Sequence, residues 1–214
     1  MDEQQFYEYL TNKTAQVFQR SPIKQKQESL GNYAVCATPI QREKGIIFGL
    51  NWRAEKNKPY RIPDPNIMSD GSCIKNYPFV IRAKPYLSKY LGLDVDHPDF
   101  NYTNLCFFRS YDTAALEERD WANSMELFME YVDYIDPPFL LMLGTTQVKR
   151  LRELPLLSGE LDKHIHLTSK ALYSSYSVLL KNGSKLICVP HPQARLSNTT
   201  RHELWKKACR ILDE

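Results

Sequence analysis

The chain has 214 residues, of which 43% are apolar and 12% aromatic, and its formal charge at pH 7 is +3. This length fits one domain with a substantial core, and no apolar run approaches the roughly 20 residues that cross a bilayer. The small net charge does not by itself indicate a nucleic-acid partner, because the distribution of positive side chains matters more than their sum. A single globular domain over residues 1–214 is expected.

The N-terminal residues and the cysteines exclude several classes of protein. Met1 to Gln5 lack the basic start and apolar stretch of a signal peptide, so we expect a cytoplasmic protein. The five cysteines form no Cys-x-x-Cys pair of the kind that begins a zinc or iron–sulfur site, and we expect free thiols. His164 and His166 could face one side of a strand, but no third ligand accompanies them. We therefore expect no metal and no cofactor.

Short apolar runs alternate along the chain with segments whose apolar residues recur at helical spacing. Four runs resemble buried parallel strands: Lys44–Leu50, Tyr102–Phe108, Phe139–Gly144 and Lys185–Val189. Helices are expected over residues 2–20, from about Pro85 to Leu91, from Asn123 to the Pro137-Pro138 pair, from Thr145 or Thr146, over Thr168–Leu180, and from about Thr200.

This alternation predicts the fold class. Strands that alternate with helices imply a mostly parallel sheet, since each parallel crossover places a helix on one face of the sheet. The expected class is α/β, a three-layer α/β/α sandwich with a central, mostly parallel four-stranded sheet. Residues 51–77 turn polar and carry several prolines, which predicts a long loop after the first strand. Long loops in compact domains are usually functional or disordered.

Two of the predicted strands end in polar motifs. The first ends in Gly49-Leu50-Asn51-Trp52, and the fourth is followed by His191-Pro192-Gln193-Ala194-Arg195. Ligands of open parallel sheets bind outside the carboxyl ends of the strands, so the two motifs are expected to face one cleft.

The order of these parts resembles the uracil-DNA glycosylase superfamily, an α/β/α fold whose first motif ends strand one and whose second ends strand four. The resemblance covers residues 44–212. Gly49-Leu50-Asn51 is similar to the Gly-x-Asn start of the first motif in the single-strand-selective and mismatch-specific branches. It implies that Asn51 positions the hydrolytic water. Trp52 stands where the family usually has proline.

The second motif of the family is usually His-Pro-Ser-Pro, and His191-Pro192 is similar to its start. The resemblance implies that His191 donates a hydrogen bond to the base as negative charge develops there. Gln193-Ala194 replace the Ser-Pro pair. Arg195 falls where the family inserts a wedge side chain into the duplex.

The remaining base-binding residues are also implied by the resemblance. Asn104 is similar to the second-strand asparagine that reads the edge of the uracil. Phe79 is similar to the aromatic residue that stacks on the base, with Tyr60 as the alternative. Gly49 and Leu50 complete the base-binding set. The iron–sulfur branches of the family need clustered cysteines, which this chain lacks.

The chemistry of glycosidic bond cleavage suits these residue types. The departing base carries negative charge, and a positioned donor such as His191 can contribute about 3 to 4 kcal/mol to its stabilisation. The amide of Asn51 cannot act as a general base, but its carbonyl can orient water, so slow turnover is expected. The amide of Asn104 can donate to a carbonyl and accept from a ring N–H, as recognition of uracil requires.

Positive side chains gather around both motifs and indicate DNA as the partner. Arg53, Arg195 and Arg201 are the expected DNA contacts, and phosphate contacts of this kind weaken as salt rises. Extrusion of a base costs a few kcal/mol, which the wedge Arg195 and the stacking ring of Phe79 would offset. We expect a monomer that acts on single- or double-stranded DNA, without membrane association.

Each residue also has a structural interpretation. Asn51 could cap the turn after the first strand, and Asn104 could belong to a buried hydrogen-bond network. Phe79 and Trp52 could be core aromatics, and His191 a structural hydrogen-bonding residue. The basic C-terminal helix could simply present a solvated face.

The leading expectation is a DNA base-excision glycosylase that hydrolyses the N-glycosidic bond of uracil or a related damaged pyrimidine. The alternative is a catalytically inactive nucleic-acid-binding protein with a glycosylase-like fold, motivated by Trp52 and Gln193-Ala194. A third possibility is a hydrolase or transferase of small nucleosides, because the cleft position is common to α/β folds. No glycine-rich phosphate loop supports this third function.

Overall fold

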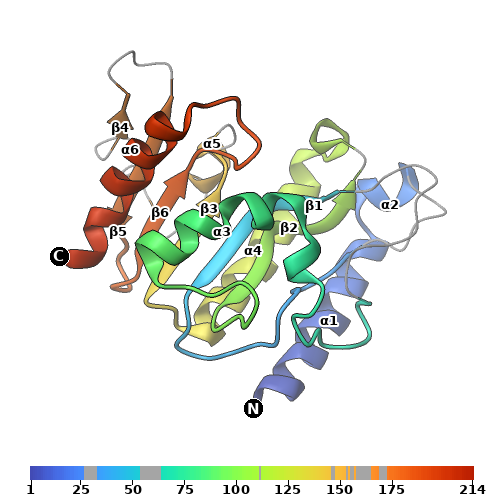
Figure 1. The fold of residues 1–214 in the computed structure, drawn as a ribbon. Coiled ribbons are helices and arrows are strands. Elements are labelled where there is room, and N and C mark those ends of the chain that lie inside the picture. Colours follow the sequence, from blue (N-terminus) through green and yellow to red (C-terminus); the bar gives the residue numbers. More distant parts are fainter. Residues whose placement is uncertain are drawn as a thin grey trace.

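The computed structural model describes residues 1–26, 33–53, 64–110, 112–145, 148–152, 154, 157, 165–168 and 173–214. Within these ranges the chain folds into one six-stranded sheet with helices on both of its faces (Figure 1). In the part of the chain that is described, no helix is long and apolar enough to cross a membrane.

Four strands of the sheet are parallel and lie side by side. Their spatial order is β2 (Asn101–Ser110), β1 (Ile46–Arg53), β3 (Phe139–Leu143) and β6 (Lys185–Val189). An antiparallel pair, β5 (Ser174–Leu179) and β4 (Ile165–Leu167), extends the sheet beyond β6. The mostly parallel α/β sandwich is therefore confirmed, but the sheet has six strands and not the four expected.

The helix expected over Thr168–Leu180 is wrong, because Ser174–Leu179 forms strand β5. The Asn182-Gly183 pair, interpreted as the end of a helix, instead closes the hairpin between β5 and β6, where Leu180 and Ser184 are joined by a backbone hydrogen bond. Gly183 has φ +87°, a positive value that is common both at the ends of helices and in hairpin turns. The same dipeptide therefore signals either structure.

Six α-helices and three 3₁₀ helices are placed by the described residues. The α-helices are α1 (Glu3–Gln19), α2 (Pro22–Lys26), α3 (Pro78–Leu91), α4 (Glu118–Ile135), α5 (Val148–Leu151) and α6 (Asn198–Cys209). The 3₁₀ helices are η1 (Ile74–Asn76), η2 (Thr113–Ala115) and η4 (Arg210–Asp213).

Three of these helices begin earlier than expected. Helix α3 starts at Pro78, and α4 starts after a capping box in which Asp120 accepts from the backbone N–H of Glu117. Asn123 therefore lies inside α4. Helix α6 is capped by Ser197, whose hydroxyl accepts from the N–H of Thr200. Thr146, one of the two expected starts of α5, lies outside the described residues.

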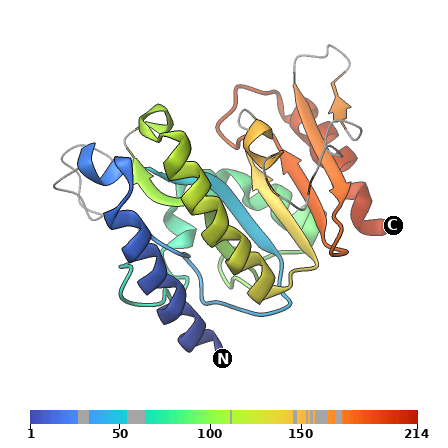
Figure 2. The ribbon, with the colours of Figure 1, turned by 180° about the vertical axis from the view of Figure 1, so that it is seen from behind.

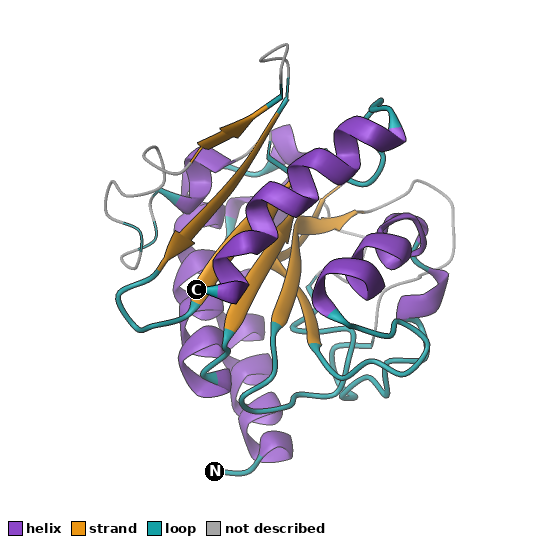
Figure 3. Ribbon diagram, turned by 60° about the vertical axis from the view of Figure 1, so that its left-hand side comes forward, coloured by secondary structure: helices purple, strands orange, loops and turns teal. Residues whose placement is uncertain are grey.

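The helices form two layers, and each layer packs against one face of the sheet through a hydrophobic core. Helices α1 and α4 cover one face (Figure 2), where Phe48 and Leu105 of the sheet meet Phe128 of α4. Helices α3 and α6 cover the other face, where Tyr102 and Val189 belong to the same core as Trp205 of α6. Figure 3 shows the sheet between these layers.

Candidate functional site

The amide of Asn104 lies over Gly49, its partner in the register of β1 and β2. A Cβ atom at position 49 would lie only 2.5 Å from Oδ1 of Asn104. Glycine is therefore what allows the amide to occupy this position. Asn104 is 3% exposed, and no hydrogen bond joins its amide to any other residue that the structure describes. Because buried amides normally have partners, this one is available to a ligand.

A second polar group lies at the same place. The hydroxyl of Tyr102 would be 3.7 Å from the same Cβ position, and it is buried without a hydrogen-bond partner among the described residues. Burial raises the pKa of Tyr102 well above its ordinary value, so the hydroxyl keeps its proton. Tyr102 and Asn104 are two residues apart on β2 and share one face of the sheet. This two-residue spacing was the signal by which Tyr102 could have been found.

Aromatic rings surround this pair of polar groups. The Tyr102 ring lies 6.1 Å from those of Trp52 and Tyr77 and 5.8 Å from that of Phe79, measured between centroids. Tyr77 and Phe79, at the start of α3, are stacked with centroids 5.9 Å apart. The half-buried ring of Phe79 is in turn 6.3 Å from the imidazole of His191. Phe79 therefore connects the start of β2 with the loop after β6.

His191 lies in that loop as a neutral hydrogen-bond donor. Its Nδ1 accepts from the backbone N–H of Gln193 at 3.2 Å, so the neutral imidazole carries its proton on Nε2. Burial lowers the pKa of His191, and the positive charges of Arg201 and Arg82 lower it further. Near neutral pH the ring is therefore uncharged, with an N–H to donate.

Arg201 holds the loop that carries His191. Its guanidinium donates to the backbone carbonyls of His191 at 3.1 Å and Ala194 at 2.7 Å, and it lies 6.0 Å from the centroid of Tyr86. Only 8% of Arg201 is exposed. The expected DNA contact by Arg201 is thus corrected, because the side chain is buried and engaged with the loop.

Other positive side chains fit a surface contact better. Arg195 is exposed, as a wedge residue must be, and its carbonyl accepts from the hydroxyl of Tyr173. Arg82 was not predicted, but it is exposed on α3 and its charge acts on His191. Nothing is described of the Arg53 side chain. Five further residues, positive or considered above as possible site residues, lie outside the described part of the chain: Lys56, Lys58, Tyr60, Arg61 and His164.

Asn51 lies at the end of β1 with both ends of its amide engaged. Its Nδ2 donates to Oγ of Ser110 at 2.7 Å, and its Oδ1 accepts from the hydroxyl of Thr113 at 3.1 Å. The β1–β2 register shifts between Asn51 and Trp52. The carbonyl expected to orient water thus already accepts one hydrogen bond, and Asn51 has a structural role, which it fills by linking β1 to Ser110 and Thr113 and not by capping the turn after β1.

Trp52 and Leu50 have structural environments. Trp52 is 4% exposed, and its Nε1 donates to the carbonyl of Ala34 at 2.7 Å. Leu50 packs against the core beneath α1 and α4, on the face of the sheet opposite Asn104. Because the Leu50 side chain lies on the opposite face, only the backbone of Leu50 could contribute to the site near Asn104.

Neither protein-family models nor curated proteins match this chain. The resemblance to uracil-DNA glycosylases therefore stays a prediction from the residues alone. Of the predicted base-binding and catalytic residues, four are linked on one face of the sheet, where Tyr102 connects the first two with the others: Gly49, Asn104, Phe79 and His191.

This face of the sheet combines three chemical capacities. It offers a buried amide that can donate and accept, aromatic rings on which a planar group can stack, and a neutral imidazole that can donate to a developing negative charge. Within the described part of the chain, no three His, Cys, Asp or Glu side chains are grouped so that they could hold a metal ion.

Proposed function

We propose that the chain is a DNA base-excision glycosylase that hydrolyses the N-glycosidic bond of uracil or a related damaged pyrimidine. The observation that carries this proposal is the unpartnered amide of Asn104 beside Gly49, with Phe79 linking its surroundings to His191. An amide, a stacking ring and a neutral donor are the groups needed to recognise a uracil and to stabilise it as it departs.

The amide of Asn104 would distinguish uracil from cytosine. Uracil presents a carbonyl and a ring N–H on its pairing edge, which match the donor and the acceptor of one amide. Cytosine presents an amino group and an unprotonated ring nitrogen, so donor would meet donor and acceptor would meet acceptor. With Oδ1 placed toward the ring N–H, these mismatches would leave buried polar groups unpaired and disfavour cytosine, whereas an amide rotated by 180° would pair with cytosine instead.

His191 would stabilise the leaving base. Cleavage places negative charge on the pyrimidine, and the Nε2–H of a neutral imidazole can donate to the charged carbonyl oxygen. The Gln193 N–H fixes the tautomer, and Arg201 fixes the backbone of the loop. This donor is thus held in place before the substrate binds, which is the condition for effective charge stabilisation.

One observation favours the second candidate, a nucleic-acid-binding protein without base release. The carbonyl of Asn51 accepts from Thr113, so one of its two lone pairs is already occupied. A glycosylase with this site would have to hold its water at the remaining lone pair or rely on His191 and substrate binding alone. In both cases hydrolysis would be slow.

The test is base release from single- and double-stranded oligonucleotides that contain uracil. His191→Ala and Asn104→Ala are the variants at the site, and His97→Ala is the matched control, because His97 is exposed and distant in sequence from both motifs. Release that is lost in both site variants and retained in His97→Ala would support the glycosylase. DNA binding without release would support the second candidate, and neither binding nor release would refute both.

A further inference from the structure

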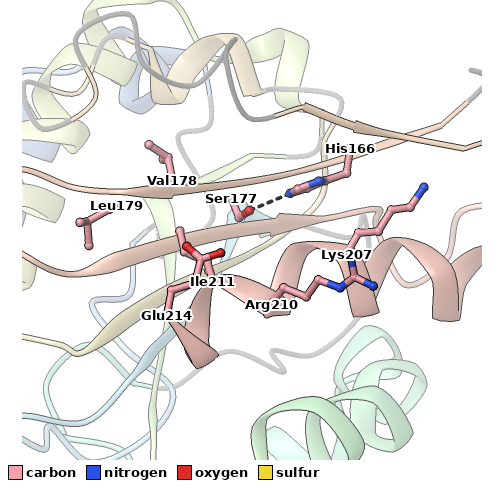
Figure 4. Close-up of a pocket in the computed structure, with 8 residues that line it drawn as sticks. All are labelled: His166, Ser177, Val178, Leu179, Lys207, Arg210, Ile211 and Glu214. Atoms are coloured by element: carbon pink, nitrogen blue, oxygen red, sulfur yellow. Dashed lines mark hydrogen bonds between the residues drawn. The ribbon is translucent and has the colours of Figure 1, made fainter.

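A pocket of about 300 Å³ lies between the β4–β5 hairpin and the helical segment of α6 and η4 (Figure 4). None of the residues that line it belongs to the candidate site around Asn104 and His191. Its volume is at the lower end of the range found for ligand pockets, so it has room for a small molecule.

A hydrogen-bonded pair forms one wall of this pocket. Nε2 of His166 on β4 and Oγ of Ser177 on β5 are 2.7 Å apart. Ser177 is 6% exposed, and the two side chains face the helical segment that carries Lys207 and Arg210 (Figure 4). The hydroxyl and the imidazole give this wall polar atoms that can hydrogen-bond a ligand.

Lys207 and Arg210 make one end of the pocket positive. The ammonium of Lys207 is held by the carbonyl of Leu167 at 2.9 Å and the carboxylate of Glu203 at 2.7 Å, which leaves one N–H for a ligand. Arg210 is exposed, and no hydrogen bond or ion pair joins its guanidinium to another described residue. A guanidinium of this kind can bind a carboxylate through two parallel hydrogen bonds.

The other end of the pocket is negative, and its wall is partly apolar. Figure 4 shows the carboxylate of Glu214 and the guanidinium of Arg210 on opposite sides of Ser177. Leu179, which is 60% exposed, and Ile211 lie on the same side as Glu214. A ligand with a negative group at one end, an apolar chain in the middle and a positive group at the other end would match the order of these pocket groups.

We propose that this pocket binds a small organic zwitterion of the ω-amino acid type. Its carboxylate would bind Arg210 and the free N–H of Lys207, its methylene chain would cover Leu179 and Ile211, and its ammonium group would lie beside Glu214. The site is independent of the glycosylase proposal, since it shares no residue with it.

The test compares three ligands with the same number of carbon atoms on the full chain, by chemical-shift titration of the labelled protein. Aminohexanoate carries a positive far end, hexanoate an uncharged one and adipate a negative one. We expect affinity to fall in that order, with shifts at Ser177 and Arg210. Equal binding of the three ligands, or no binding of any, would overturn the proposal.

Variants separate the two charged ends. Arg210→Met should weaken all three ligands by about tenfold or more, because charge-assisted hydrogen bonds are lost. Glu214→Gln should weaken only aminohexanoate, by about two- to fivefold, and should strengthen adipate. Lys206→Met is the control, since Lys206 is exposed on α6 outside the pocket. Binding by Arg210→Met that equals that of the parent protein would refute the site.

Discussion

Arg201 acts on His191 in two ways. Its guanidinium donates to the backbone carbonyl of His191 at 3.1 Å, and its charge lowers the pKa of the imidazole of the same residue. The first interaction fixes where the ring is, and the second favours its uncharged form. One buried cation thus helps to fix the position of the proposed donor and adds to the effect of burial, which is the main cause of the lowered pKa of His191.

Removal of this cation should raise the pKa of His191. In Arg201→Met the positive charge is absent, so protonation of the imidazole becomes less unfavourable, whereas Arg201→Lys keeps the charge but loses the paired hydrogen bonds. Arg201→Met should also lose about 1.5 to 3 kcal/mol of stability. An NMR titration of the His191 ring tests the effect, and identical pKa values in the parent protein and Arg201→Met would contradict it.

Acidification should destabilise the protein partly through His191. The pKa of this residue in the folded protein lies below its ordinary value of 6.5. Between these two values the unfolded chain binds a proton that the folded chain does not, so stability falls as pH drops through this window. Urea unfolding at several pH values should show a smaller acid loss for His191→Gln than for the parent protein. Equal losses in the two proteins would mean that His191 is not the group concerned.

Gly49→Ala should displace the Asn104 amide, because the new methyl group would lie 2.5 Å from Oδ1. We expect a loss of about 1 to 3 kcal/mol in stability, as overpacked cores show, together with loss of base release. Gly45→Ala is the matched control, since its methyl group would meet the ring of Phe139 instead. Base release per folded molecule that falls equally in both variants would argue against a recognition role for Asn104.

Thr113→Val tests whether Asn51 can orient water. Valine has a similar shape but lacks the hydroxyl that donates to Oδ1 of Asn51, so the lone pair that Thr113 occupies is released for a water molecule. If that hydrogen bond is worth about 1 kcal/mol, base release should accelerate by about fivefold. Asn51→Ala should slow it. Unchanged rates in both variants would leave Asn51 a purely structural residue.

The salt dependence of DNA binding should identify the phosphate contacts. Arg82→Ala and Arg195→Ala should each reduce the slope of log affinity against log salt by about 1. Arg20→Ala is the control, because Arg20 is exposed at the end of α1, in the opposite helix layer. A slope that changes equally in all three variants would indicate diffuse attraction without specific contacts.

The parallel strands could be predicted because a strand buried on both faces reads as an unbroken apolar run, as in Phe139–Leu143. Strand β5 was missed because Tyr176, Leu179 and Leu180 also recur at helical spacing and the following Asn182-Gly183 also fits a helix end, although Ser175 and Ser177 alternate with Tyr176 and Val178 as in a strand. The hairpin depends on pairing with β6, which is not a local property of the sequence.

The candidate residues could be placed from the sequence where the strand and helix signals are local. Asn104 lies on a strand, His191 follows one, and Phe79 lies in the first turn of α3. The engagement of Asn51 could not be predicted, because it depends on a register shift in β1 and on Thr113, which lies far along the chain. The exposure of Arg201 was predicted wrongly, because a charged side chain on a helix usually faces solvent. Here the guanidinium is buried and donates to two loop carbonyls.

The contact between Gly49 and Asn104 also constrains how this protein can change. The amide of Asn104 occupies space that a side chain at position 49 would need, so the two positions, on different strands, are sterically coupled. A larger residue at 49 would be tolerated only with a smaller one at 104, and this exchange would give up the amide. Any redesign of this part of the sheet should therefore alter both positions together, and a larger residue at position 49 alone should be poorly accepted.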